Sequence, residues 1–402
     1  MRVSVGYSEN PDVAAAAREA IADAMEKGDA SRPCDVALLF STSRHDPALL
    51  GEAVAAGIGG APRIVGGGAI GAMSNDRFGY AGDQVGLAMF WLSGDASCDI
   101  VAQDGMKEDE RKAGVELGRK LRKLGTGPDT PVMLFYDAID ATGPKVRLLM
   151  ATPLLAGLRD GLGFLPNLVG AGLMGDYSCT PIRQWNGAGL AEYNAVALKF
   201  GGGVRLDSAI LRGCRPATGY YTVTRAEGQV ILEINGEPAL TFLHKLIGPA
   251  IPPEEYGFFL ILGINHGEKW GQFNEENYAG RLCLGIDRER NGIVMFEPDM
   301  VAGTVFQIMY RSLDPDFVEP KMEALFAGLE GRKPAFAFFI DCAGRAAGYA
   351  GVDIEDAAII QKIVAGRVPF LGIYSGVEIA PVLGEPRPLD WTGVFCLFSE
   401  PA

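Results

Sequence analysis

The chain has 402 residues, of which 48% are hydrophobic and 21% charged, a composition typical of a folded globular protein. Its formal net charge of −14, without a basic cluster, opposes binding to phosphate backbones and anionic lipid, so nucleic acid and membrane are excluded as expected partners. Because single hydrophobic cores usually stop growing near roughly 250 to 300 residues, we expect two domains.

The N-terminal residues 1–10 resemble an opening strand and lack the apolar stretch of a signal peptide. The apolar runs at 258–264 and 335–340 are shorter than the roughly 18 residues that a membrane helix needs. Seven scattered cysteines without a Cys-x-x-Cys pair indicate a reducing compartment and no zinc site. We therefore predict a cytoplasmic protein, in which His45, His244 and His266 are the few candidates for histidine chemistry.

A repeated unit of strand, helix and glycine-rich stretch is the most informative pattern in the chain. Its two clear copies share a proline, a valine and three spaced glycines, and a weaker third copy lies near the C-terminus. The copies are predicted at 36–40, 46–57 and 62–71, at 132–136, 147–161 and 166–175, and at 335–340, 353–366 and 369–376. The first two copies lie farther apart in the sequence than successive repeats of a solenoid do. We therefore interpret the copies as duplicated supersecondary units.

Closely spaced strands separate the second copy from the third. A hairpin is predicted over 221–227 and 229–235 with Gly228 at its turn, followed by strands near 258–264, 280–287 and 292–296. We therefore expect an α/β (mixed α+β) fold with repeated strand–helix–strand units, antiparallel hairpins and helices outside the sheets. The change of pattern places the domains at 1–205 and 206–402.

Both N-terminal glycine stretches spell G-x-G-x-x-G, the fingerprint of dinucleotide binding. That fingerprint requires a helix to begin at the glycines, since the helix N-terminus holds the pyrophosphate. Here residues 72–80 are typical of turns and residues 83–91 of a strand, so the pattern favours close strand packing or a loop around a small ligand.

Several segments in chain order resemble the FIST family, named for F-box and intracellular signal transduction proteins. On the N-terminal side they are the strand 36–40, VGGG at 65–68, VGAGLMG at 169–175 and WNG at 185–187. On the C-terminal side they are YTVT at 221–224, NGEPAL at 235–240, AGR at 279–281, DCAGR at 341–345 and GIYSGVEI at 372–379. Val377 departs from the glycine that the family pattern favours before the glutamate.

The resemblance implies N- and C-terminal FIST domains, at 1–205 and 206–402, of the kind found in bacterial sensory proteins. It also implies a small-molecule ligand, with amino acids suggested, and some relatives resemble haem-binding nitric-oxide sensors. Because the two FIST-like domains use nearly the whole chain, a sensory signal is expected to pass to a downstream signalling protein or through conformation alone.

Arg345 and Glu378 are the first candidates for ligand contact, because an amino acid offers a carboxylate to a guanidinium and an ammonium to a carboxylate. The alternative is that the two side chains pair with each other. Arg281 has the same chemistry, with a solvated or cross-strand role as its alternative. Cys342 follows a strand and could act as a nucleophile, although no histidine base is near in sequence and buried cysteines are common.

Further ligand-binding candidates lie in loops and in the glycine-rich stretches. The loop at 263–278 gathers polar and aromatic residues, and His266 is its candidate for ligand or metal contact. Asp76, Asp176 and Tyr177 could line the same pocket as this loop, with turn chemistry as the alternative. The remaining candidates are Asn265, Tyr374, Ser375, Gly67, Gly68, Gly172 and Asn75.

The sequence thus predicts a small-molecule-binding sensory protein in which no catalytic set is recognisable. Two alternatives remain open: an enzyme that uses Cys342 or Glu378 on a small metabolite, and a haem-based gas sensor with His266 as axial ligand.

Overall fold

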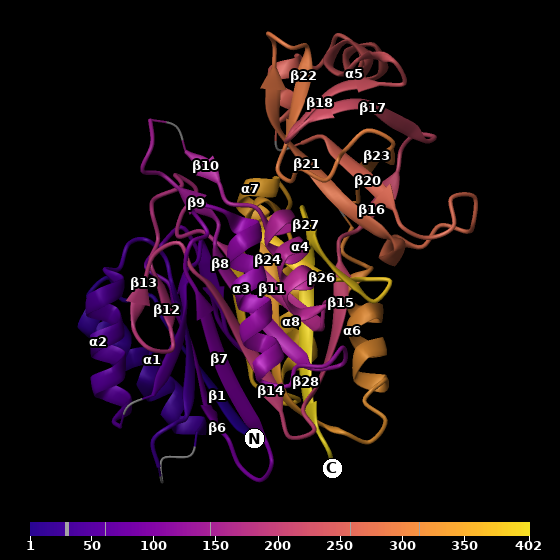
Figure 1. The fold of residues 1–402 in the computed structure, drawn as a ribbon. Coiled ribbons are helices and arrows are strands. Elements are labelled where there is room, and N and C mark those ends of the chain that lie inside the picture. The colour runs from indigo at the N-terminus through magenta and orange to yellow at the C-terminus, as the bar shows by residue number, and fades with distance from the viewer. Residues whose placement is uncertain (29–31, 61, 145, 258, 313) are drawn as a thin grey trace.

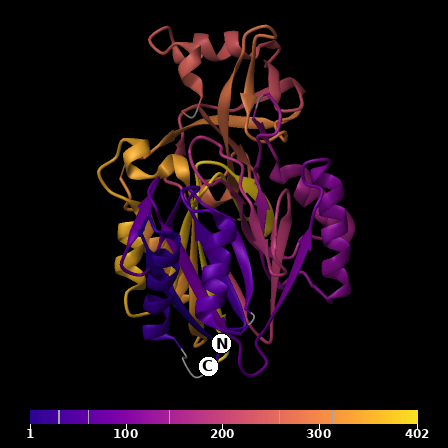
Figure 2. The ribbon, with the colours of Figure 1, turned by 90° about the vertical axis from the view of Figure 1, so that its left-hand side faces the viewer.

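The computed structural model describes residues 1–402 apart from 29–31, 61, 145, 258 and 313. A body of sheets and helices holds both termini at one end, and a smaller unit formed by residues 214–311, here called the insert, lies at the other end (Figure 1). Figure 2 shows helices on different sides of this body and the insert above it. The predicted mixed α+β class, with helices outside the sheets, is confirmed.

The body consists of three copies of one unit, in which the order of elements is strand, helix, strand, helix and then further strands. The first repeat contains β1 (Arg2–Ser8), α1 (Val13–Lys27), β2 (Val36–Ser41), α2 (Pro47–Ile58), β3 (Arg63–Gly68), β4 (Gly71–Met73), β5 (Phe78–Tyr80) and β6 (Val85–Trp91). The second contains β7 (Ser97–Gln103), α3 (Glu110–Lys123), β8 (Pro131–Asp137), β9 (Ile139–Asp140), β10 (Arg147–Leu148), α4 (Ala151–Leu162), β11 (Asn167–Leu173), β12 (Gln184–Asn186), β13 (Leu190–Ala191) and β14 (Ala195–Gly201).

The third repeat begins before the insert and resumes after it. It contains β15 (Arg205–Leu211), α6 (Val318–Ala327), β24 (Lys333–Cys342), α7 (Ala347–Ala350), α8 (Asp356–Val364), β25 (Phe370–Ser375), β26 (Val377–Val382), β27 (Glu385–Leu389) and β28 (Gly393–Glu400), with a 3₁₀ turn at Ala343–Arg345. The weaker copy predicted near the C-terminus is therefore present, and its helix is α8.

Each repeat joins two parallel strands by a helical crossover and then gives a strand to another repeat's sheet. The parallel pairs are β2 with β3, β8 with β11, and β24 with β25. Beyond each pair, β3 binds β12 of the second repeat, β11 binds β26 of the third, and β25 binds β4 of the first. The exchange is cyclic, so each six-stranded sheet of the body contains strands from two repeats.

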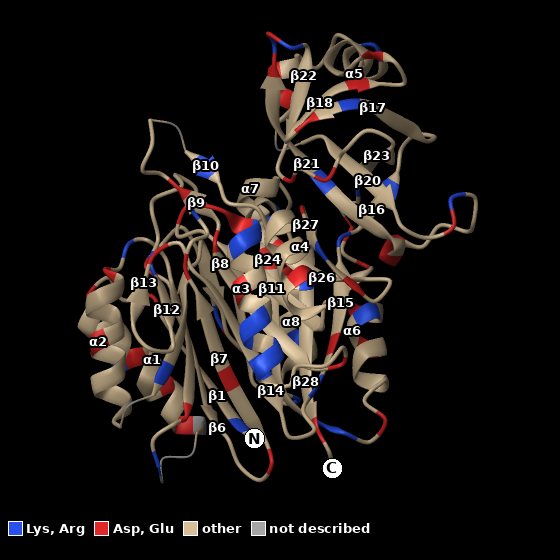
Figure 3. Cartoon of the chain, in the orientation of Figure 1, with Lys and Arg blue, Asp and Glu red and all other residues tan. Residues whose placement is uncertain are grey.

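The inner faces of these sheets share one hydrophobic core. Alternation along β8 illustrates the pattern, because Met133 and Phe135 face this core whereas Leu134 and Tyr136 face the helices α3 and α4. Since both faces are covered, the strands are almost continuously apolar, and charged side chains lie mainly on helices and loops (Figure 3).

Three phenylalanines, one from the middle strand of each repeat, meet in this core. The ring centroids of Phe40 and Phe135 are 5.2 Å apart, those of Phe40 and Phe338 are 5.8 Å apart, and those of Phe135 and Phe338 are 5.9 Å apart. These distances lie in the range of favourable aromatic contact. The three sheets therefore converge on one point of the core.

The insert has its own sheet and core. Its elements are β16 (Cys214–Pro216), β17 (Tyr221–Glu227), β18 (Val230–Ile234), β19 (Glu237–Pro238), α5 (Ala239–Ile247), β20 (Ile261–Asn265), β21 (Tyr278–Asp287), β22 (Gly292–Met295) and β23 (Val305–Arg311), with 3₁₀ turns at Pro253–Tyr256 and Glu275–Asn277. The predicted hairpin is β17 and β18, which pair antiparallel. Apolar residues of α5 pack against this sheet.

No helix begins at the glycine-rich stretches of the first two repeats. Gly68 is followed by the short strand β4, and Leu173 is followed by a loop that leads to β12. The structure thus agrees with the interpretation that these glycines serve strand packing rather than pyrophosphate binding.

Glycines bring α3 and α4 into backbone contact. A Cβ atom at Gly157 would overlap the carbonyl oxygen of Arg111, and one at Gly114 would overlap that of Leu154. Gly118 and Gly161 face the partner helix in the same way. The helices therefore approach more closely than side chains would permit.

Gly157→Ala should lower the free energy of unfolding by roughly 1 to 3 kcal/mol, because the methyl group forces the two helices apart. Urea denaturation measures the change. Gly189→Ala is the control, since a Cβ at this position has no neighbour within 4 Å and should leave stability nearly unchanged. Equal effects of the two substitutions would contradict the close approach.

Candidate functional site

The carboxyl ends of the three parallel strand pairs meet in a ring of backbone hydrogen bonds. The amide of Ile70 donates to the carbonyl of Tyr374 at 3.0 Å, and the amide of Gly376 donates to the carbonyl of Gly172 at 3.0 Å. The amide of Ser43 donates to Gly175 at 2.9 Å and closes the ring between the second repeat and the first. Ligand sites of α/β proteins are commonly found at this end of parallel strands.

A cavity of about 140 Å³, here called the central cavity, lies between this ring and the insert. It is mainly apolar, and both the body and the insert contribute to its wall. The lining residues are Ile70, Leu148, Met174, Tyr177, Cys179, Leu282, Leu284, Phe296, Cys342, Ala343, Gly344, Tyr349, Ser375, Gly376 and Asp390. Asp390 is the charged residue among them.

Asp390 joins the body to the insert and keeps one oxygen unpaired. Its Oδ2 accepts a hydrogen bond from the amide of Leu282 at 2.9 Å, whereas its Oδ1 is buried without a partner among the described residues. Burial raises the pKa of this carboxyl to about 6, and the nearby Arg281 opposes the rise. The group is therefore mostly ionised at pH 7 and has a free acceptor.

Ser375 and Glu378 form a buried pair beside the cavity wall. The Ser375 hydroxyl donates to Glu378 Oε1 at 2.9 Å, and Glu378 Oε2 has no partner among the described residues. Burial raises the pKa of Glu378 well above its usual range, with Asp390 and Asp341 adding to the rise. Glu378 thus orients the Ser375 hydroxyl and does not itself line the cavity.

Cys342 lines the cavity as a buried thiol. Burial raises its pKa well above the usual value, and the carboxyl of Glu378 raises it further. Because the thiolate is the nucleophilic form, this environment disfavours nucleophilic chemistry at neutral pH.

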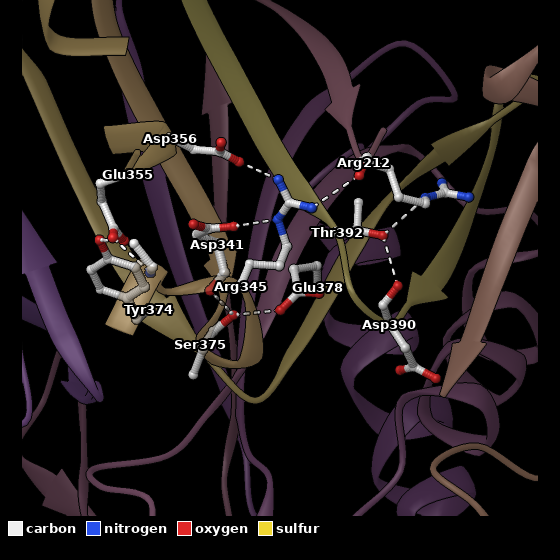
Figure 4. A network of polar contacts seen from close by, with 12 residues as sticks. Arg212, Asp341, Arg345, Glu355, Asp356, Tyr374, Ser375, Glu378, Asp390 and Thr392 are labelled. Atoms are coloured by element: carbon white, nitrogen blue, oxygen red, sulfur yellow. Dashed lines mark hydrogen bonds and ion pairs between the residues drawn. The ribbon is translucent and has the colours of Figure 1, made fainter. Parts of the chain in front are cut away.

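Arg345 is engaged by two carboxylates of its own repeat (Figure 4). Its Nε donates to Asp341 at 3.0 Å, its Nη2 binds Asp356, and its Nη1 donates to the carbonyl of Arg212 at 3.0 Å. It does not pair with Glu378. Arg345 does not line the central cavity, and it lies instead at a separate small pocket that Arg212 and Trp391 also line.

Tyr374 belongs to the neighbouring part of this network. Its hydroxyl donates to Glu355 Oε1 at 2.5 Å, and the other oxygen of Glu355 accepts from the amide of Ala347 at 2.6 Å. These bonds tie β25 to the segment that carries α7.

Arg281 is fully buried and ties the insert to β27. Its guanidinium binds Asp299 through Nε and Nη2, and its Nη1 donates to the carbonyls of Gly280 at 2.7 Å and Pro388 at 2.8 Å. Because its donors are engaged in this way, its role in the structure is to anchor the insert.

Asn265 and His266 lie away from the central cavity. Asn265 donates to the hydroxyl of Tyr220 at 2.8 Å within the insert. Burial lowers the pKa of His266 to about 4, and Arg387 and Arg281 lower it further, so the imidazole is neutral at pH 7.

The remaining candidates are packing residues. Gly68 allows the loop at Gly175 to approach, and Gly67 lies against Leu173. Gly172 contributes its carbonyl to the ring of strand ends. Asn75 binds the carbonyl of Val368 and the amide of Phe370, both near the amino end of β25, which is opposite the cavity.

The structure adds residues that the sequence had not singled out. Glu297 of the insert accepts from the amides of Ala151 at 3.0 Å and Thr152 at 2.8 Å, and so caps α4, whose own N-cap residue Met150 makes no such bond. The lack of a capping residue before a predicted helix is a weak sequence signal that a distant side chain caps the helix. For Asp390, the sequence holds no signal beyond a polar residue after a strand.

Comparison with known proteins agrees with this architecture. The model of the FIST N domain matches residues 35–237, and that of the FIST C domain matches residues 239–381. The chain therefore belongs to the FIST family, whose domains are sensory domains of signal transduction. The expected division of the chain after residue 205 stays a prediction.

The similar proteins come from mycobacteria. An uncharacterized protein of Mycobacterium tuberculosis is 28% identical over 423 residues, which cover 100% of both chains. An uncharacterized protein of Mycobacterium bovis is 29% identical over 201 residues, which cover 49% of this chain and 52% of the relative. In the described part of the chain, every helix is too short or too polar to cross a membrane.

The contribution of three buried carboxyl groups to stability should fall as the pH rises from about 4 to about 7. Burial raises the pKa of Asp137 and Glu297 to about 7 and that of Asp390 to about 6, so the folded state favours their protonated forms. The stabilisation is complete below the unfolded-state pKa near 4 and is lost as the pH rises through the folded-state values.

Urea midpoints at pH 5 and pH 7.5 measure this dependence, and Glu297→Gln should reduce the difference between them because the group no longer titrates. Glu289→Gln, at an exposed position, is the control. A difference as large in Glu297→Gln as in the parent protein would contradict the assignment.

Proposed function

We propose that this protein is a sensor that binds a small organic ammonium compound, an amino acid or a related amine, in the central cavity without turnover. The observation that carries the proposal is Asp390, whose buried Oδ1 lacks a partner among the described residues at the wall of an apolar cavity. A carboxylate in such a site is stabilised by a charged hydrogen-bond donor.

The shape of the cavity supports a ligand with one charged end and an apolar body. Leu282, Leu284 and Phe296 of the insert and Met174 of the body provide apolar wall. Ser375 and Cys342 also line the cavity and add a hydroxyl and a thiol to its wall. Burial of the apolar part contributes affinity, and the ion pair with Asp390 fixes orientation.

The position of the central cavity between the body and the insert provides a way for ligand binding to become a signal. The cavity wall is shared by the body and the insert, so a ligand there contacts both and favours the arrangement in which they are closed on it. We propose that this arrangement is what a downstream signalling protein recognises in the cytoplasm.

The groups present do not support the alternative chemistries. Cys342 is held as a thiol, and none of the lining residues is a histidine that could act as its base. Haem does not fit, because the cavity of about 140 Å³ is smaller than the roughly 300 to 1,000 Å³ typical of drug-sized ligands, and His266 is not among its lining residues.

A matched series tests the proposal: leucine, 3-methylbutylamine and 4-methylpentanoate share an apolar body and differ in their charged groups. Leucine or the amine should raise the melting temperature of the protein by several degrees at saturation, whereas the acid alone should not. Differential scanning fluorimetry followed by calorimetry measures both effects.

Asp390→Asn should weaken amine binding at least tenfold, because it removes the charge that the ammonium group contacts. Asp160→Asn, on the exposed face of α4, is the matched control and should bind as the parent protein does. The proposal would be contradicted if the protein bound the acid in preference to the amine, or if Asp390→Asn left the affinity for the amine unchanged.

A further inference from the structure

Arg212 differs from the other fully buried arginines in its surroundings. Arg281 pairs with Asp299, and Arg345 pairs with two aspartates. Arg212 is 1% exposed, and no carboxylate forms an ion pair with it among the described residues. Its Nε donates to Thr392 Oγ1 at 3.2 Å and its Nη1 to the carbonyl of Tyr278 at 2.9 Å, while its Nη2 has no partner among those residues.

A buried guanidinium without a counter-charge is unfavourable, since desolvation is not offset by an ion pair. Burial lowers the pKa of Arg212, and Arg281 and Arg345 lower it further. The carboxylate that most raises the pKa of Arg212 belongs to Glu275. This carboxylate already accepts a hydrogen bond from the amide of Cys214 and forms an ion pair with Lys321. The protein's own described groups thus leave the charge of Arg212 without direct compensation.

Arg212 lines a small pocket with two other nitrogen donors, here called the arginine pocket. Trp391 is 6% exposed, and its Nε1 is buried without an acceptor among the described residues. The guanidinium carbon of Arg311 lies 4.8 Å from the centroid of the Trp391 ring, and its Nη2 donates to the carbonyl of Ala350 at 2.9 Å. All three side chains line the same pocket.

Three further charged side chains line the arginine pocket, those of Arg345, Asp356 and Asp314. Asp356 binds Arg345, and Asp314 accepts a hydrogen bond from the amide of Asp316 at 3.1 Å. Arg212 Nη2 and Trp391 Nε1 are thus two buried donors of the lining residues that lack an acceptor in the described part of the chain, and an anion would supply one.

The pocket encloses about 40 Å³, which is room for on the order of three or four non-hydrogen atoms. A planar group of that size matches the planar guanidinium of Arg212. We propose that the arginine pocket binds a planar oxyanion, either a small free anion or the carboxylate of a larger molecule, through Arg212, Trp391 and Arg311. This site is distinct from the central cavity, and the inference does not depend on the proposed function.

Isothermal calorimetry with formate, nitrate and hexanoate tests the site, with ionic strength held constant by sodium sulfate. Saturable 1:1 binding of formate and nitrate identifies a site for a free anion. Binding of hexanoate without formate identifies a site for the carboxylate of a larger ligand, and both results support the proposal.

Arg212→Gln, Arg311→Gln and Trp391→Phe should each weaken this binding, the first at least tenfold. Trp391→Phe keeps the ring and removes the N–H donor, so it remains informative if Arg212→Gln fails to fold. Arg215→Gln, at an exposed position on β16, should leave binding unchanged. The proposal is overturned if none of the three anions binds saturably, or if Trp391→Phe and Arg311→Gln both bind as Arg215→Gln does.

Discussion

The contact among Phe40, Phe135 and Phe338 is the constraint on which the body depends. Each ring belongs to the middle strand of a different repeat, so the contact fixes the three sheets around one point. Once the middle strands converge, their parallel partners β3, β11 and β25 end near one another, and the backbone ring at Ile70, Gly172 and Gly376 becomes possible. The position of the central cavity thus follows from how the core is packed.

The insert is attached to this end of the body by charged groups that are removed from water. Arg281 binds Asp299 and the backbone of β27, Asp390 binds the backbone of β21, and Glu297 caps α4. Buried polar contacts contribute little net stability compared with apolar packing, but they specify geometry because each unmet group is costly. Asp390, one of the groups that dock the insert, is therefore also the charged group of the cavity beneath it.

Local pattern was sufficient to predict the parallel strands and crossover helices of the three strand–helix–strand units, the third repeat and the hairpin of the insert. It did not predict the helices α1, α3, α5 and α6, or strands such as β14, β15 and β28. Apolar runs of strand length and glycine-rich stretches are properties of adjacent residues, so they can be recognised without knowledge of the fold. The exchange of β4, β12 and β26 between sheets could not be predicted, since each pairing joins segments that are distant in sequence and short.

The candidate site was predictable only in part, for the same reason. Ser375 and Cys342 lie on the cavity because they follow predicted strands, at the end where ligands bind. The partners of Arg345 are Asp341 and Asp356, and the capping role of Glu297 depends on a helix that precedes it by many residues. Sequence shows that such groups are charged, but only the fold shows which of their atoms remain unpaired.

The cyclic exchange of strands has a consequence for the origin of the chain. A polypeptide containing one repeat would have no sheet of its own able to accept its donated strand, whereas three copies arranged in a circle would satisfy one another completely. The fold therefore has the arrangement of a closed trimer whose three subunits are joined in a single chain. The third copy carries the insert, and all three copies contribute to the closed ring of strand ends.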